Sequence, residues 1–349
     1  MKKGEALEHF KQNYLKSYLE EDVLKLEEYY DKYRLQLSEG FIRSFGEICK
    51  KIKGMQASGL KDKIGFINYS ILRTKIISNN YNYSIYAYDK NWYFDQNECK
   101  VEYDVSWAFD FFKEFMNYLE EKRKPYLNKV INSDIERIAL NETDFYSKPI
   151  LKLARHAILE AIKIKEYQEI EKEDVLEIRF GEYKSISEVV YKDDTRIKDS
   201  NEMKDWLEEK NLNEYIYEVF KNLDLSEGNY EGIDLTYTDF RGSNLSKSNL
   251  KKSILFGSRL GNCNLQKVDF TEAIMTDADF QCADLSSAVL CNCNMEGTSL
   301  EKADLSSVDF RGATLRKTCF KGSKLNGARF LMKDIQYLDD EQKSVVMTD

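Results

Sequence analysis

Large apolar side chains recur at every fifth residue in the last third of the chain. The series begins at Leu225, ends at Ile335 and covers 23 positions without a slip in register. The residue two places before each large one is mostly small, and the residue between them is often Asp or Asn, as in Ala283-Asp284-Leu285. The pattern therefore predicts a repeating unit of five residues with two inward positions.

A period of five fits neither regular secondary structure. On an α-helix it advances by about 500°, so the apolar side chains would spiral around the whole surface. On a straight strand an odd period places successive large residues on opposite faces. We therefore expect the chain to turn a corner in every unit. Glycines two places after the large residue, such as Gly257 and Gly312, suit these corners because glycine tolerates a positive φ.

The unit, of the form A(D/N)Lxx, resembles the pentapeptide-repeat family, for instance in Ala303-Asp304-Leu305-Ser306-Ser307. The family winds four units per turn as a right-handed quadrilateral β-helix, so the resemblance implies nearly six coils for residues 223–337. When the large residues are sorted into four ladders, each made of residues 20 apart, phenylalanine occurs in only two of them. This segregation supports four units per turn. The expected core ladders include Leu225, Leu245, Leu265, Leu285, Leu305 and Leu325, with Phe240, Phe280 and Phe320, and Phe270, Phe310 and Phe330.

Residues 1–222 are predicted to form a mostly α-helical domain with small β-hairpin elements. Alternating aromatic or β-branched residues around a turn predict hairpins at Tyr83–Phe94 and Val175–Tyr191. Apolar residues at helical spacing predict helices at about 7–30, 41–52, 64–77, 105–119, 126–142, 150–170 and 201–221.

The expected architecture is a two-domain α+β chain: residues 1–222, the β-helix at 223–337 and a capping tail at 338–349. A solenoid exposes unpaired backbone at both ends. The helix at 201–221 is placed to cover the first coil, and the tail could cover the last. The tail could instead form a dimer contact, so a monomer and a homodimer are both considered.

An aromatic run in the first domain allows two interpretations. Its side chains could pack a hairpin onto helices, which we favour, or stack on bases or sugars. Only Lys90 adds a basic charge, so direct binding of nucleic acid is not expected. The run consists of Tyr81, Tyr83, Tyr86, Tyr88, Trp92, Tyr93 and Phe94.

Composition narrows the class of protein. The chain is 42% hydrophobic and 32% charged, as is typical of soluble globular proteins. No apolar run approaches the roughly 20 residues of a membrane span. A cytoplasmic location is expected, with no membrane partner. Seven cysteines show no framework spacing, and the C-x-C at Cys291 and Cys293 lacks a second pair, so neither a metal nor a cofactor is expected.

Chemistry-bearing motifs are scarce. The chain has two histidines, His9 and His156, and no phosphate loop, dinucleotide fingerprint, zinc-protease motif or nucleophile elbow. We expect a non-catalytic protein. An enzyme within residues 1–222 is the most distant alternative.

The favoured function is a protein-binding or scaffold role for the flat faces of the β-helix, with a partner of unknown identity. Some pentapeptide-repeat proteins protect or inhibit DNA gyrase as DNA mimics, so the resemblance implies gyrase or topoisomerase modulation as an alternative. Residues 223–337 contain 15 acidic and 14 basic residues, and their far end is basic, which is unlike a DNA mimic. The hypothetical interaction patch at that end consists of Arg311, Arg316, Lys317, Lys321, Lys324 and Arg329.

Overall fold

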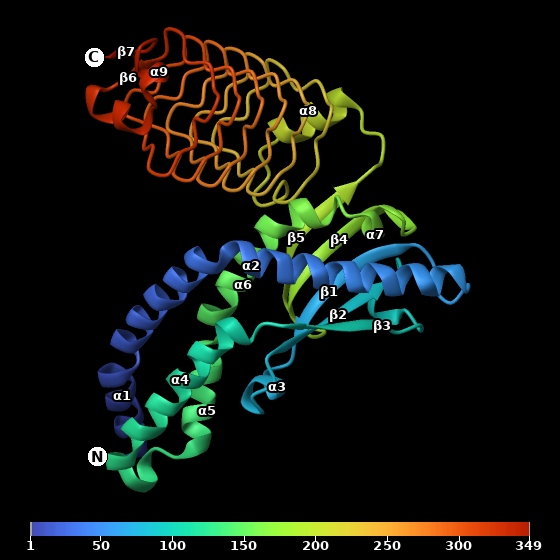
Figure 1. Cartoon of the computed structure of the whole chain (residues 1–349), viewed down its shortest axis with the longest axis vertical. Helices are drawn as coiled ribbons and strands as arrows, with labels where there is room; N and C mark the ends of the chain where they lie inside the picture. The colour runs from blue at the N-terminus through green and yellow to red at the C-terminus, as the bar shows by residue number, and fades with distance from the viewer. Residues whose placement is uncertain (1, 349) are drawn as a thin grey trace. The chain divides into compact units, whose positions relative to one another are not determined.

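A computed structural model describes residues 2–348 of the chain, which forms two compact units. The units comprise residues 1–194 and 195–349 (Figure 1). The five-residue series had suggested a boundary after residue 222. Residues 195–222 instead belong to the same compact unit as the coils.

The first unit is helical, but its strands join in one five-stranded sheet rather than in separate small hairpins. The strand order is β3-β2-β1-β4-β5; β1 and β4 run parallel, and the other neighbours are antiparallel. The strands are β1 Ile64–Ile71, β2 Asn82–Tyr88, β3 Cys99–Asp104, β4 Lys172–Glu182 and β5 Ser187–Asp194. The helices are α1 Lys3–Tyr14, α2 Lys16–Ala57, α3 Arg73–Ile77, η1 Trp92–Phe94, α4 Ser106–Arg123, η2 Lys124–Lys129, α5 Asn132–Asn141, α6 Thr143–Ala161 and α7 Lys165–Gln168.

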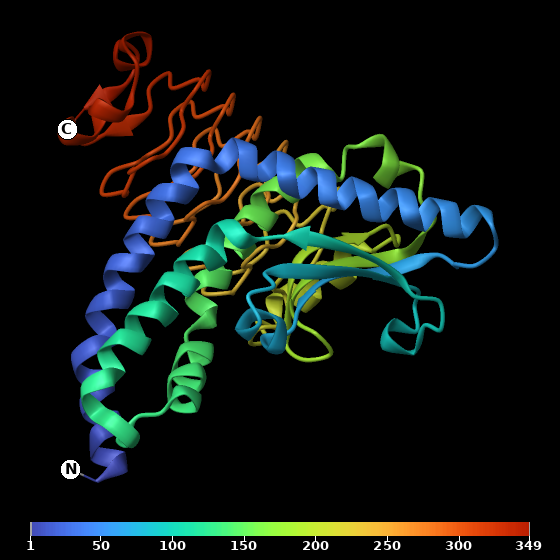
Figure 2. The ribbon, with the colours of Figure 1, turned by 60° about the horizontal axis from the view of Figure 1, so that its bottom comes forward.

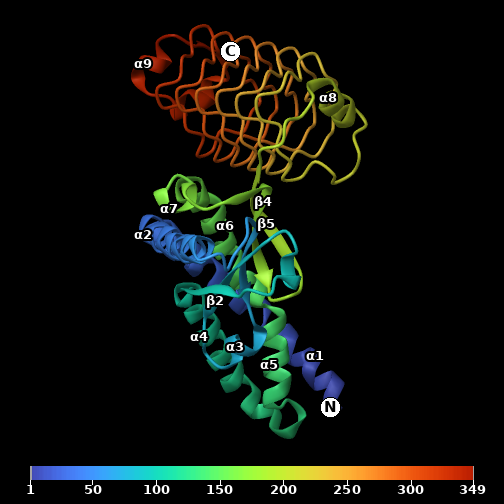
Figure 3. The same ribbon diagram turned by 90° about the vertical axis from the view of Figure 1, so that its right-hand side faces the viewer.

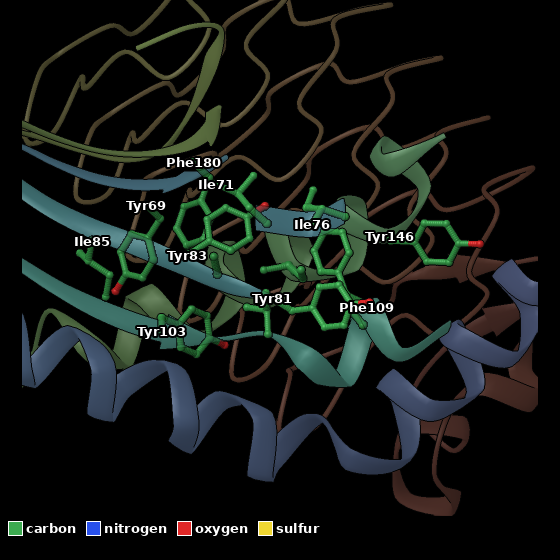
Figure 4. Close-up of a cluster of buried hydrophobic side chains, with 14 of the residues drawn as sticks. Tyr69, Ile71, Ile76, Tyr81, Tyr83, Ile85, Tyr103, Phe109, Tyr146 and Phe180 are labelled. Atoms are coloured by element: carbon green, nitrogen blue, oxygen red, sulfur yellow. The ribbon is translucent and has the colours of Figure 1, made fainter. Parts of the chain in front are cut away.

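Helix α2 crosses one face of this sheet (Figure 2). Phe41 of α2 stacks on Tyr69 of β1 with ring centroids 5.4 Å apart, and Tyr69 stacks on Phe180 of β4 at 4.2 Å. Tyr81 stacks on Phe109 of α4 at 5.4 Å (Figure 4). Aromatic side chains therefore supply much of the apolar surface that the sheet and helices bury together.

The helix predicted at 64–77 is wrong. Its first part is strand β1, in which Ile67, Tyr69 and Ile71 are buried toward the helices, and only its end is helical, as α3. Asn68 and Ser70 alternate with the apolar residues, as the period of a strand requires. Pairing with β4 decided the outcome, because no helix can satisfy a distant strand's backbone groups.

The predicted helices at 105–119, 126–142 and 150–170 correspond to α4, to α5 and to α6 with α7. The expected helix at 201–221 is shorter. It ends at Glu208 as α8, Ser200–Glu208, and the residues after it enter the first coil.

One carboxyl group lies inside the helical packing. Asp22 of α2 is 2% exposed; its Oδ2 accepts a hydrogen bond of 2.8 Å from the Tyr146 hydroxyl, and its Oδ1 has no partner among the described residues. Burial raises the pKa of this carboxyl, and the Tyr146 hydrogen bond and the charge of Lys25 offset the rise only in part.

Replacing Asp22 with Asn should stabilise the protein at neutral pH. A carboxyl whose pKa is raised by folding contributes favourably below its unfolded pKa of about 3.9 and loses that contribution as pH rises through the folded value. Asn cannot ionise, so D22N should melt higher than the wild type at pH 7–8, by about 2–4 °C for each kcal/mol gained. The gain should disappear near pH 4. The exposed Asp31→Asn is the control, and an equal shift at all pH values would contradict the assignment.

The second unit is a stack of coils (Figure 3). Residues 20 apart form parallel β-bridges from Val219↔Asp239 to Asp309↔Arg329. Among residues 209–328 these are single-residue bridges, and no longer strands are present. Four pentapeptides therefore complete one turn of the chain.

Each unit ends in a tight turn. In the turn after Phe240, the Ser243 amide donates to the Phe240 carbonyl at 2.9 Å, and Gly242 has a φ of 76°. A positive φ at the third residue is the mark of a type II turn. Lys247 takes the same conformation, with a φ of 59°, so glycine is favoured at the corners but not required.

All twelve predicted ladder residues are buried. None is more than 3% exposed, and residues 20 apart stack; the rings of Phe310 and Phe330, for example, lie 4.7 Å apart. The series also begins earlier than the sequence suggested. Tyr215 and Phe220 keep the five-residue register and are fully buried.

Helix α8 covers the open backbone of the first coil. The Ser200 hydroxyl accepts from the Asp224 amide at 3.0 Å, and the Glu208 carboxylate accepts from the Asn229 amide at 3.0 Å. In later coils the corresponding amides donate to the preceding coil. Trp206 adds an apolar contact with Phe220, with ring centroids 5.8 Å apart.

The C-terminal segment lies against the last coil. Strand β7, Met347–Thr348, pairs in parallel with β6, Arg329–Phe330, and the Gln342 amide group donates to the Phe320 carbonyl at 2.7 Å. Between these strands are the short helices η3, Met332–Tyr337, and α9, Asp340–Lys343.

Candidate interaction surface of the coils

The recurrent Asp and Asn residues have a structural role at the corners. Oδ1 of Asp284 accepts a hydrogen bond from the Ser286 amide at 3.0 Å. This turn-forming bond to the residue two places on explains why Asp and Asn recur without any need for a charged surface. It is found at Asp224, Asp234, Asp239, Asn244, Asn249, Asn264, Asp269, Asp279, Asp284, Asn294, Asp304 and Asp309.

Several of these carboxylates are also paired with cations on the same or the neighbouring coil. Lys251 Nζ lies 3.0 Å from Asp269, and Arg311 Nη2 lies 2.6 Å from Asp309. Burial raises the pKa of the Asp269 carboxyl. The hydrogen bonds that the Thr271 hydroxyl and amide donate to it, together with Lys251, bring that pKa below its ordinary value. Local pairing therefore balances part of the negative charge, while Asp277, Asp279 and Asp284 have no ion-pair partner among the described residues.

Asp239 is the most enclosed of these groups, with no exposed surface. Arg241 lies 2.7 Å from its carboxylate, Arg259 3.5 Å and Lys221 3.7 Å. Burial by itself raises the pKa of Asp239, but the Arg241 hydrogen bond and the charges of Arg259, Arg241 and Lys221 hold it below its ordinary value. This cluster joins three successive coils.

The structure does not gather the hypothetical basic patch on one face. Its six residues fall within a single turn of the coil, and two of them, Arg311 and Arg329, share a side, since Arg329 bridges to Asp309, the ion-pair partner of Arg311. Lys324 bridges to Asp304 and Arg329 bridges to Asp309, so these two cations lie on different sides. The patch residues thus form a basic ring around the last coil.

Half of this ring is already paired. Arg311 pairs with Asp309, Arg316 with Glu296, and Lys324 with Asp304 at 3.2 Å. The members without an ion-pair partner among the described residues are Lys317, Lys321 and Arg329.

One side of the coils carries a short apolar stretch on its outer surface, between Asp234 and Asn294 of the same ladder. Ile254 and Ile274 occupy outward positions that are mostly Asp or Asn elsewhere, and they bridge to each other. Ile274 is 42% exposed, and Phe256 is half-buried beside Tyr237, with ring centroids 5.3 Å apart. We call Ile254, Phe256 and Ile274 the apolar strip. The sequence carried a sign of it, since isoleucine interrupts the Asp and Asn pattern at two positions 20 apart.

The other candidate groups do not assemble into a site. Cys293 is buried beside the Phe270 carbonyl, whereas Cys291 is half-buried. His9 contacts the Tyr126 hydroxyl at 2.7 Å. Within residues 2–348, no three His, Cys, Asp or Glu side chains come together as a metal site. Over the same residues, no helix has the length and apolar character needed to cross a bilayer.

The aromatic run in the first unit has both buried and exposed members. Tyr81 and Tyr83 lie in the core, as the packing interpretation expected, and Tyr83 lies 5.7 Å from Phe180. Phe94 is 82% exposed, on the loop between β2 and β3.

Two family models match the coils. Residues 219–251 match the model described as pentapeptide repeats (8 copies), and residues 263–339 match the pentapeptide repeat region. Neither match extends into residues 1–218. A search of curated proteins finds no match.

The solved structures that are similar to this chain include pentapeptide repeat proteins and a fluoroquinolone resistance protein. Rfr23 from the cyanobacterium Cyanothece 51142 is 23% identical, with 38% of this chain and 88% of that one covered and a TM-score of 0.26. QnrB1, a plasmid-mediated fluoroquinolone resistance protein, is 20% identical, with 39% and 85% covered and a TM-score of 0.20. A pentapeptide repeat protein from the Arabidopsis thaliana thylakoid lumen is 31% identical, with 35% and 72% covered and a TM-score of 0.15. These TM-scores are too low to bear on function.

Proposed function

The C-terminal region of this chain, residues 219–339, belongs to the pentapeptide-repeat family, and from that premise we propose that the protein is a non-catalytic scaffold that binds a protein partner. The observation that carries the proposal is the apolar strip on a surface whose recurrent Asp and Asn side chains are engaged in turns. Apolar side chains on a rigid face provide contact area that a partner can bury at little conformational cost.

The winding of the coils is part of the proposal. The 20-residue bridges support a quadrilateral β-helix, and we take its hand to be right-handed, as in the family. A cytoplasmic location completes the proposal. The first unit is treated as non-catalytic, and turnover of a nucleotide or sugar substrate by the intact chain would contradict that view.

The scaffold function can be tested with matched surface variants. Ile254→Asp with Ile274→Asp should abolish retention of the partner by the immobilised protein, because charges would replace the apolar contact. Ser286→Asp with Ser306→Asp, on another side of the coils, is the control. Quantitative mass spectrometry of co-purifying proteins should identify a protein kept by the wild type and the control but lost by the strip variant. Identical sets for all three would place the contact elsewhere.

DNA-gyrase modulation is the alternative function, and the pairing of three coil carboxylates with cations does not favour it. Asp269, Asp304 and Asp309 each have a cation within 3.2 Å, whereas a DNA mimic needs unbalanced negative charge along its length. We expect the purified protein to leave gyrase supercoiling and quinolone-induced cleavage unchanged. Inhibition of either at stoichiometric protein would replace the scaffold proposal.

The C-terminal segment is proposed to cap the last coil rather than to form a dimer. Deletion after Ile335 removes the Gln342 bond to Phe320 and the β6–β7 pairing, so the backbone of the last coil becomes open. The truncated chain should melt at a lower temperature and aggregate, while the full chain sediments as a monomer. A full-length dimer that becomes a well-behaved monomer on truncation would show that the segment is a dimer contact.

A further inference from the structure

A small cavity opens between three elements of the first unit: the end of α3, α4 and α5. Its volume is about 190 Å³. Pockets that hold drug-sized ligands measure roughly 300–1,000 Å³, so only a small molecule fits here. The cavity lies wholly within residues 76–140 and is separate from the coils.

The floor of the cavity is apolar. Ile76 and Phe112 are each 2% exposed, and Tyr81 is 6% exposed. Figure 4 shows Ile76 and Tyr81 in the same cluster of buried side chains. Met116 and Leu140 are half-buried at its sides. A hydrocarbon group that enters this space replaces water at an apolar surface, which is favourable.

The rim of the cavity carries a positive side chain at one end of its α4 side and a negative one at the other. Lys113 and Glu120 both line it, and the seven helical steps from one to the other span about 10 Å. At the Glu120 end, Arg123 donates to the Glu120 carboxylate at 2.5 Å. Glu136 of α5 also lines the cavity; it is half-buried and has no hydrogen bond or ion pair among the described residues.

We propose that this cavity binds a small organic cation, a primary amine on a branched or aromatic hydrocarbon. The hydrocarbon occupies the floor of Ile76, Tyr81 and Phe112, and the ammonium group pairs with the Glu136 carboxylate. A half-buried carboxylate without a partner is stabilised by an incoming cation more than an exposed one, because less solvent screens the pair. This binding site is independent of the scaffold function.

The test uses phenethylamine as the probe and isothermal titration calorimetry of the full chain. Phenethylamine should bind at least about tenfold more tightly than 2-phenylethanol, which has the same hydrocarbon without the charge. The anion 3-phenylpropionate should not bind. Glu136→Gln should weaken amine binding about tenfold and make the amine and the alcohol equivalent. Glu114→Gln, on α4 but outside the cavity, should bind the amine as the wild type does.

A second variant separates the cavity from the charge. Met116→Trp fills the cavity and should abolish binding of amine and alcohol alike, with an unchanged circular dichroism spectrum as the check on folding. The Met116 methyl resonance of the wild type should also shift on addition of the amine. The proposal is overturned if the wild type does not bind phenethylamine, if the alcohol binds as tightly, or if Glu114→Gln weakens binding as much as Glu136→Gln.

Discussion

Lys61→Ala should destabilise the first unit by about 3–5 kcal/mol. Lys61 Nζ donates to Asp95 Oδ2 and to the Asn97 carbonyl, each at 2.5 Å, and the paired side chains are 1% and 2% exposed. Without the lysine, a carboxylate would be buried beside the Asp89 amide with no cation. Thermal unfolding followed by circular dichroism measures the loss.

The pH dependence of this loss identifies its cause. Burial raises the pKa of Asp95, but the hydrogen bond from Lys61 and two backbone amides bring it below its ordinary value. Such a group stabilises the fold above its unfolded pKa of about 3.9, and the contribution is lost as pH falls through the folded value. The deficit of Lys61→Ala should therefore be largest near pH 7 and should shrink below pH 4.

Two further variants serve as controls. Lys63→Ala removes an exposed lysine of the same loop and should change stability little. Lys61→Met combined with Asp95→Asn leaves no buried charge and should recover part of the loss. A double variant no more stable than Lys61→Ala would show that the ion pair is not the origin of the effect.

Leu285→Ala should destabilise the coils by about 2–5 kcal/mol. Leu285 is fully buried between Leu265 and Leu305, so truncation leaves a cavity in the middle of the stack. Because each coil contacts only its neighbours, the defect weakens the interfaces on both of its sides. Chemical denaturation of the full chain, followed by circular dichroism, reports the change in free energy of unfolding.

Ser286→Ala is the matched control, because its side chain points outward at the adjacent position. It should change stability by less than about 0.5 kcal/mol. A Leu285→Ala protein that unfolds at the wild-type denaturant concentration would contradict the stacked-coil arrangement.

The repeat could be predicted because its information is local. Each pentapeptide contains its own inward pair, such as Ala283 and Leu285, its own turn-forming residue, such as Asp284, and its own corner. The family matches confirm the repeat. The early start at Tyr215 and Phe220 was missed because the residues two places before them, Asn213 and Glu218, are not small.

The candidate surface was only partly predictable. The basic residues from Arg311 to Arg329 are neighbours in the sequence, but one turn of the coil spreads them over four sides. Ile254 and Ile274 are 20 residues apart and yet touch. Closeness on this surface follows the turn length rather than the sequence separation, so a patch must be sought at intervals of 20.

The sequence by itself determined the five-residue corner, the inward ladders and the helices α4 to α6, since turn chemistry and apolar spacing act within a few residues. Only the tertiary structure decided that Ile64–Ile71 is a strand, because its parallel partner is β4, which lies far downstream. It also decided that the helix covering the first coil ends at Glu208 and that Glu136 lines an apolar cavity. Those outcomes depend on which distant backbone or side-chain group is close enough to bond, which local pattern does not encode.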